Sequence, residues 1–158
     1  MSKSYLEKIR TLTRHITNVQ QNCNLLGEKL IENDEFDFAK LLISSGLLHD
    51  NSKFHGMEWD MLTTENTDPI SLKLSVGQHN KSNTHHPEYW GGIKKMPRIA
   101  IAELVCDWKE RSSEFGTSLL EWIENNAMQR FDFNKNDDVY KEIMYFVNLL
   151  VDKPFKQV

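Results

Sequence analysis

Apolar residues recur at helical spacing along almost the whole chain, and no run of alternating residues indicates a strand. The first such segment extends from about Ser4 to Ile31. Its apolar stripe consists of Leu6, Ile9, Leu12, Ile16, Val19 and Cys23. With 158 residues and no linker or internal repeat, the chain has the length of one domain. We therefore predict an all-α protein, a compact bundle of about six or seven helices in which residues 1–158 form a single domain.

Capping and breaking residues divide the next part of the chain. Asp34 is expected to cap a second helix, Phe36–Leu48, whose apolar stripe includes Phe38, Leu41, Leu42 and Leu48. Asn51-Ser52-Lys53 is typical of a turn, and a short helix should follow around Met57–Thr64. These elements put the dipeptide His49-Asp50 at the end of the second helix.

The second half of the chain contains further helix signals. Asp68-Pro69 should begin a helix that reaches Ser82, and the polar stretch Asn83–Gly92 should be a loop. Pro97 begins a helix to Glu114, which Gly116 terminates. Thr117 should cap a helix to about Arg130. Asp137 or Asp138 begins the last helix, and Pro154 prevents it from continuing.

Composition limits the classes of function. Hydrophobic residues make up 39% of the chain and charged residues 27%, which suits a globular core. The net charge of −4 predicts no extended nucleic-acid surface, so an anionic substrate needs a local positive site. Cys23 and Cys106 are too few and too far apart for a disulfide framework, and we expect both in the core. Without a signal peptide or a membrane span, we expect a cytoplasmic protein that does not bind membranes.

The six histidines are distributed unevenly. His15 lies on the first helix, His49 and His55 flank the first polar turn, and the other three cluster near the second polar loop: His79, His85 and His86. Imidazole and carboxylate groups together are the ligands of divalent transition metals such as Mn, Fe, Co, Ni or Zn. Taken alone, however, His15 would be better explained as a core histidine, and the pair His49-Asp50 is common.

Asp107 is a stronger candidate, because it lies beside an apolar register of the helix 97–114. A carboxylate at the edge of a core is costly unless it has a cationic partner or a metal. Arg111, four residues later, offers the simpler explanation of a surface ion pair. Glu103, one turn earlier on the same face, could be a substitute ligand or could support one.

The order of these residues resembles the HD superfamily of metal-dependent phosphohydrolases. In that family a His on the first helix, a His-Asp pair and a distant Asp meet at one metal inside a helical bundle. The resemblance implies that His15, His49, Asp50 and Asp107 are metal ligands. The all-α layout agrees with this family independently of the motif.

A second resemblance, to the HD-GYP branch, involves the remaining histidines. The turn His49–Lys53 is similar to the branch's HD-x-x-K turn, and the segment 85–92 is similar to its His-His-Glu segment. The segment 85–90 is also similar to small phage and bacterial HD-like proteins. The branch implies a second metal held by Asp50, His79 and His85, with Asp50 bridging two ions and His86 as either a further ligand or a phosphate contact. Because Trp90-Gly91-Gly92 replaces the Gly-Tyr-Pro signature, the cyclic dinucleotide substrate of that branch does not carry over.

The predicted function is hydrolysis of a phosphoester, in a small phosphorylated substrate such as a nucleotide, by a water that the metal activates. Asp50 and Lys53 are the expected catalytic residues, Lys53 by neutralising phosphate charge. HD deoxynucleotidases carry Glu at the position of Lys53, so an acid role there does not transfer. Lys81, Lys94, Lys95 and Arg98 surround the His-rich loop and could contact phosphate, although a surface charge is the simpler interpretation of each. Trp59, Tyr89 and Trp90 could stack on a base, although packing is the simpler role for large aromatics, and five others are assigned to the core: Trp108, Trp122, Phe131, Tyr140 and Phe146.

Two other functions fit the same sequence. The first is an HD-like module that binds metal and nucleotide without turnover, as a sponge. The second is a helical partner-binding protein or homodimer, in which the apolar stripe of the helix 137–151 would form an exposed seam. That stripe, which completes the intramolecular core in the simpler interpretation, is Val139, Ile143, Phe146, Val147 and Leu150.

Overall fold

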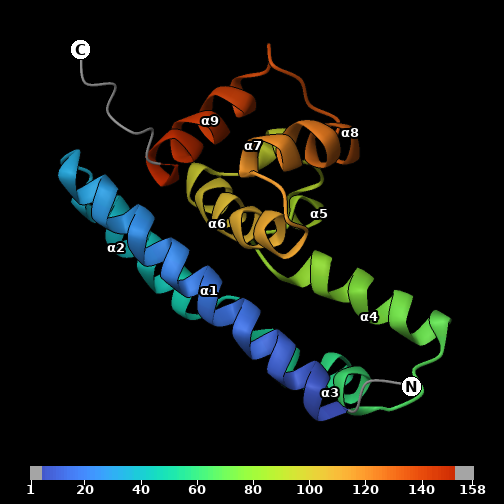
Figure 1. Cartoon of the computed structure of the whole chain (residues 1–158). Coiled ribbons are helices and arrows are strands. Elements are labelled where there is room, and N and C mark those ends of the chain that lie inside the picture. The colour runs from blue at the N-terminus through green and yellow to red at the C-terminus, as the bar shows by residue number, and fades with distance from the viewer. Residues whose placement is uncertain (1–4, 152–158) are drawn as a thin grey trace.

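The computed structural model describes residues 5–151, which contain helices and no strand, as predicted. Helix α1 (Tyr5–Glu32) and helix α2 (Phe36–Leu47) lie side by side as an antiparallel pair (Figure 1). The buried face of α1 follows the helical repeat and consists of His15, Ile16, Val19, Asn22, Cys23, Leu26, Gly27 and Leu30. One polar face and one apolar face therefore explain why this segment packs as a surface helix.

Helices α1 and α2 lie close together at Gly46. A Cβ atom at this position would lie 2.6 Å from Cys23 Cβ and 2.8 Å from Cys23 Sγ. Cys23 and Gly46 are both buried between the two helices. Neither helix backbone can move apart there without opening the core. The absence of a side chain at Gly46 thus allows the spacing that brings His49-Asp50 toward α1.

Gly46→Ala is therefore expected to destabilise the protein by about 1–3 kcal/mol, the usual cost of overpacking a core. The matched control is Gly77→Ala on a later helix, where an added Cβ meets nothing within 4 Å. There the substitution should stabilise by about 0.5–1 kcal/mol, because alanine favours the helix. Chemical denaturation of both variants measures the two effects, and equal stabilities would contradict the close approach.

The middle of the chain forms an arm of short elements beside the helix pair. The 3₁₀-helix η1 (Asn51–Phe54) and helix α3 (Gly56–Thr63) follow α2, and helix α4 (Pro69–Ser82) packs against α3 at one end and α5 at the other. Asp68 caps α4 by accepting hydrogen bonds from the backbone N–H groups of Ile70 and Ser71. In Figure 1, α4 extends away from α6 toward α3.

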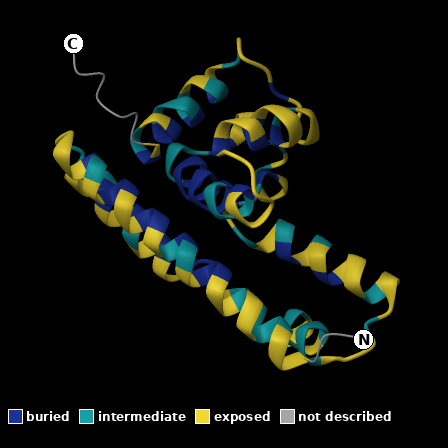
Figure 2. Ribbon diagram, in the orientation of Figure 1, coloured by how far each residue is buried: buried dark blue, intermediate teal, exposed yellow. Residues whose placement is uncertain are grey.

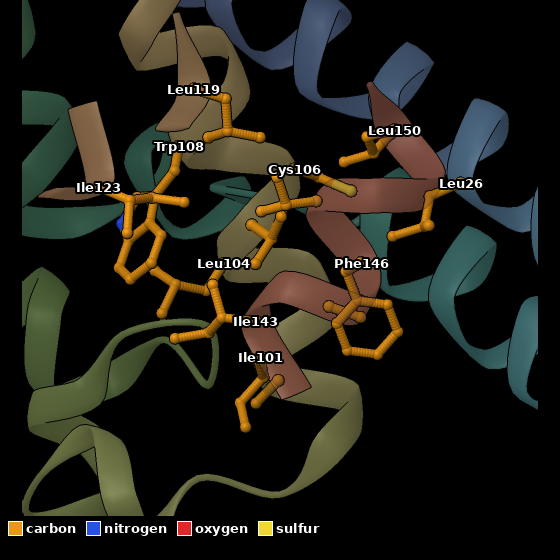
Figure 3. Packing of buried hydrophobic residues seen from close by; sticks show 14 of the residues in the cluster. Leu26, Ile101, Leu104, Cys106, Trp108, Leu119, Ile123, Ile143, Phe146 and Leu150 are labelled. Atoms are coloured by element: carbon orange, nitrogen blue, oxygen red, sulfur yellow. The ribbon is translucent and has the colours of Figure 1, made fainter. Parts of the chain in front are cut away.

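Helix α6 (Arg98–Glu114) is the centre of the fold. Its middle, residues 100–108, is buried throughout (dark blue in Figure 2), because α1, α2, α7 and α9 all pack against it. The other elements of this half are α5 (Pro87–Trp90), η2 (Ile93–Lys95), α7 (Leu119–Trp122), the π-helix η3 (Ile123–Ala127), α8 (Met128–Arg130) and α9 (Asp138–Leu150). Figure 3 shows the apolar side chains of α6, α7 and α9 meeting Leu26 of α1.

The core confirms several sequence predictions. The apolar stripe of α9 is buried within the chain, so it completes the intramolecular core and is not an exposed seam. Cys23 and Cys106 are free and fully buried. Six helices have eight residues or more, and the continuous run 119–130 is a seventh among the described residues. None of the described helices is long and apolar enough to cross a membrane.

Other expectations for the helices are wrong in detail. Asp34 does not cap α2 but adopts a left-handed backbone conformation. Glu35 occupies the N-cap position, and its side chain accepts no hydrogen bond from the first turn of the helix. Ser118, not Thr117, caps α7, in a reciprocal capping box with Glu121. The predicted loop 83–92 contains α5, since Pro87 begins a short helix that sequence periodicity cannot detect.

The predicted stripe of the second helix is also partly wrong. Leu41 and Leu48 are 60% and 66% exposed, and the buried face consists of Ala39, Leu42 and Gly46. Two of these three residues, Ala39 and Gly46, are small, because α1 lies so close. On the first helix Leu6 is likewise exposed. The predicted start at Ser4 and the stop at Pro154 lie outside the described residues.

Candidate metal centre

The chain turns sharply at His49-Asp50, where α2 ends. The His49 backbone N–H donates to Gly46 O, and Asp50 adopts a left-handed conformation with φ 55° and ψ 18°. Aspartate tolerates this region better than most residues with a side chain. The turn places both side chains inside the protein, where each residue is only 2% exposed.

Four other elements bring polar side chains to the same point. His15 comes from α1, Asp107 from α6, His79 from α4, and His85 and His86 from the segment that begins α5. All the metal ligands expected from the sequence are thus brought together: His15, His49, Asp50, His79, His85, His86 and Asp107. His55 is not among them and lies exposed.

The Nε2 atoms of four histidines point at the two aspartates. His15 Nε2 lies 3.0 Å from Asp107 Oδ1. The Nε2 atoms of His79, His85 and His49 lie 3.1, 3.3 and 3.8 Å from Asp50 Oδ1. Asp50 Oδ1 is therefore the point where three imidazoles meet.

The opposite ring nitrogens of the same histidines contact carboxylates. His15 Nδ1 lies 2.9 Å from Glu114 Oε1, and His79 Nδ1 lies 2.5 Å from Glu58 Oε1. Glu103 Oε1 lies 2.9 Å from His49 Nδ1 and 3.3 Å from His85 Nδ1. A carboxylate at Nδ1 keeps the proton there, which leaves the Nε2 lone pair facing the aspartates, as in metal-binding histidines.

Six buried polar atoms of this cluster have no hydrogen-bond partner within the described chain. They are His15 Nε2, His49 Nε2, Asp50 Oδ1, His85 Nε2, His86 Nε2 and Asp107 Oδ1. Buried polar groups in native proteins are nearly always paired, so six orphaned atoms at one point call for an explanation. Imidazole nitrogens and carboxylate oxygens that face each other without bonding fit a divalent transition metal.

Possible ligand atoms of these residues and of His79 form overlapping groups. In each group, one atom from every residue lies within 4.8 Å of the others. The first group is His15, His49 and Asp50, and the second is Asp50, His79, His85 and His86. A third set, His49, His85 and Asp107, overlaps both. We call the first group position one and the second group position two; Asp50 is common to them.

The cluster favours positive charge in its interior. Burial opposes ionisation of Asp50, but the imidazoles of His79 and His85 hold its pKa well below the usual value. Burial likewise opposes ionisation of Asp107 and Glu103, yet His15 lowers the pKa of Asp107, and His49 lowers that of Glu103 to about 2. Burial opposes a charge on His85, but Asp50 and Glu103 raise its pKa to about 10. The site thus favours a proton on His85, and a metal ion would compete with this proton for Nε2.

This competition makes metal affinity depend on pH. With a pKa of about 10, His85 is protonated at pH 7, so binding at Nε2 must release its proton. Burial lowers the pKa of His86 to about 3, so that residue is already neutral. The affinity for Mn²⁺ should rise by about tenfold for each pH unit while one proton is released. Titrations at pH 6.5, 7.5 and 8.5 measure this slope, and a constant affinity would refute it.

A cavity of about 750 Å³ opens onto the centre, and Asp50, His79, His86 and Asp107 line its inner end. Four cationic side chains also line it: Lys8, Lys53, Arg111 and Arg130. The apolar lining is largely Leu12, Met61, Leu62, Leu72, Val76, Leu104, Trp108, Phe115, Trp122 and Phe131. The cavity can therefore hold a molecule with one anionic end and one apolar end.

The lining differs from the sequence predictions in two respects. Lys81, Lys94, Lys95 and Arg98 do not line the cavity; Arg98 pairs with Glu35 and Glu142. Trp59, Tyr89 and Trp90 do not line it either, and Trp90 Nε1 donates to Thr84 O. Aromatics that we assigned to the core, Trp108, Trp122 and Phe131, also line the cavity.

Arg111 and Lys53 each pair with a carboxylate. Arg111 Nη1 lies 2.9 Å from Glu114 Oε2, so the simple pair of Arg111 with Asp107 is not what compensates that aspartate. Lys53 Nζ lies 3.0 Å from Asp50 Oδ2, beside the shared carboxylate. Lys53 thus neutralises the outer oxygen of Asp50, while Oδ1 faces the histidines.

Sequence reasoning missed Glu58 and Glu114. Glu114 lies seven residues after Asp107 on α6, a spacing that returns to the same helix face, so the helical period could have revealed it. Glu58 gives no such signal, since its contact with His79 depends on how α3 packs against α4.

Comparison with known proteins gives one match of broad coverage. Residues 4–153 match a family model described as a family of unknown function, DUF5662. No curated protein and no solved structure matches the chain.

Proposed function

The chain belongs to the DUF5662 family, and we propose that it is a metal-dependent phosphohydrolase that acts on a small phosphorylated substrate. One observation carries the proposal: six orphaned ligand atoms are buried together, and three of their residues, Asp50, His86 and Asp107, line a cavity that four cationic side chains also line. The order of the ligands along the chain, which resembles the HD superfamily, agrees with it.

The proposed ligands follow the two positions. Position one uses His15, His49 and Asp50, with Asp107 beside His15, and position two uses Asp50, His79, His85 and His86. Two ions of Mn, Fe, Co, Ni or Zn suit this set of nitrogen and oxygen donors. When bound, such ions supply Lewis acidity toward a phosphoryl group and lower the pKa of water toward neutrality.

The chain's own residues orient the substrate. Lys53 reaches the shared carboxylate of Asp50 from the cavity side, so its charge lies where a phosphate would enter. Arg111, one turn after Asp107, lines the same cavity, and its guanidinium suits phosphate oxygens. The apolar wall formed by Trp108, Trp122 and Phe131 suits the base of a nucleotide.

This arrangement predicts a role for Arg111 in substrate binding. Arg111→Ala should raise KM by about 10- to 100-fold, because hydrogen bonds to a charged group contribute roughly 1.5–3 kcal/mol. Lys95→Ala, which changes a lysine outside the cavity, should leave KM unchanged. Phosphate release from mono-, di-, tri- and cyclic nucleotides, with Mn²⁺ or Co²⁺ added, provides the assay.

The same assay tests the proposed function itself. Release of phosphate or of a mononucleotide from at least one member of the panel is the expected result. Nucleotide binding without any release would instead identify a metal-dependent binding module, such as a sponge. If the protein neither binds nor hydrolyses any nucleotide of the panel, a nucleotide substrate is refuted.

A further inference from the structure

We propose that Glu103 is a positioning residue shared by both metal positions, so that one carboxylate orients a histidine in each. The proposal rests on the metal centre proposed above. Glu103 belongs to none of the ligand groups, and the proposal gives it a role beside them. The supporting observations are the contacts and the burial of Glu103, and the fact that Glu58 and Glu114 each contact a histidine of one position only.

Glu103 Oε1 lies between the two histidines. It accepts from His49 Nδ1 at 2.9 Å and lies 3.3 Å from His85 Nδ1. The two imidazole rings are themselves in contact, with centroids 4.3 Å apart. A single oxygen thus determines the orientation of two adjacent rings, one belonging to position one and the other to position two.

The second oxygen of Glu103 is held from the other side. Ser45 Oγ, on α2, donates to Glu103 Oε2. Glu103 itself is 3% exposed, and a buried carboxylate held on both oxygens has little freedom to rotate. It lies on α6 one turn before Asp107.

The other two carboxylates each serve one position only. Glu114 contacts His15 Nδ1, and His15 belongs to position one. Glu58 contacts His79 Nδ1, and His79 belongs to position two. Three carboxylates therefore hold four histidines, and Glu103 is the member of this trio that serves both positions.

This division of contacts predicts three different results from one kind of substitution. Glu→Gln keeps the size of the side chain but removes the charge that makes the opposite nitrogen a better donor to metal. Loss of such an outer contact typically lowers metal affinity by about 10- to 100-fold. Glu103→Gln should therefore weaken both Mn²⁺ positions by this factor, whereas Glu114→Gln should weaken position one and Glu58→Gln position two.

The experiment is a titration of each purified full-length protein with Mn²⁺, following free Mn²⁺ by electron paramagnetic resonance. The metal-free proteins are compared by circular dichroism and thermal unfolding. A residue with a merely structural role would lower thermal stability without changing the Mn²⁺ affinities of the folded protein. If Glu103→Gln does not fold, Ser45→Ala removes the donor to Oε2 and should weaken both positions as well.

Failure of the inference is distinguishable from failure of the metal centre. Wild-type protein that binds no Mn²⁺ would refute the centre and the inference with it. Wild-type protein that binds two ions, with only one position weakened in Glu103→Gln or with both unchanged, would overturn the shared role alone. Weakening of both positions in the Glu103 variant, and of one in each control, is the result we expect.

Discussion

Replacing Asp50 by Asn is expected to remove both metal ions and to lower phosphohydrolase activity by more than about a hundredfold. Changing a residue that only contacts a metal ligand typically lowers metal affinity or activity by up to about a hundredfold. Asp50 faces the histidines directly, so we expect a larger effect. Asp50 is the one residue common to the two positions, so both lose this carboxylate at once. Asn suits the test because it tolerates the left-handed backbone of this turn.

Two control variants make this result specific. His55→Ala removes an exposed histidine outside the cluster and should change neither metal content nor activity. His15→Ala removes a ligand of position one only and should retain one ion. Elemental analysis of the three variants, together with circular dichroism to verify folding, provides the measurement. Two ions retained in folded Asp50→Asn protein would contradict the role of this aspartate as the shared ligand.

Mn²⁺ is expected to stabilise the wild-type protein strongly. A ligand at about 100 times its Kd adds roughly 2.7 kcal/mol to the free energy of unfolding at one site, so two sites add about 5 kcal/mol. For a chain of 158 residues this corresponds to a rise in Tm of about 10–20 °C. The physical reason is that the orphaned nitrogens and oxygens gain their missing partner in the folded state alone.

Thermal unfolding with added Mn²⁺, and again after chelation with EDTA, measures this stabilisation. In Asp50→Asn the same Mn²⁺ concentration should leave Tm nearly unchanged. A wild-type Tm that is insensitive to both Mn²⁺ and EDTA would mean that the folded protein does not bind metal at these atoms. A rise of the same size in Asp50→Asn would place the metal elsewhere.

Sequence periodicity predicts most of the fold. The bounds of α1, α4 and α6 agree with the sequence predictions within one or two residues, because α1 has an apolar repeat and a proline marks the start of each of the other two helices. α5 was missed, since four residues are too few to show a repeat. The buried face of α2 was partly misjudged because it includes the small residues Ala39 and Gly46, which helical packing selects only when a neighbouring helix is close.

The candidate site was predicted in part. The order of His15, His49-Asp50 and Asp107 brought the ligands to attention, and the structure collects them at one point. The cavity could not be predicted, because its wall combines side chains from α1, α3, α4 and α6 with others that follow them in the chain. Trp108 illustrates the difficulty, since it packs in the core and also lines the cavity, and sequence spacing reports only the first of these roles.

The metal content of the purified wild-type protein tests the central claim most directly. Elemental analysis after purification without chelator is expected to find two transition-metal ions per chain, or two bound Mn²⁺ after incubation with excess Mn²⁺ and removal of the free ion. Protein that is folded, free of metal and unable to bind Mn²⁺ at pH 8.5 would contradict the account.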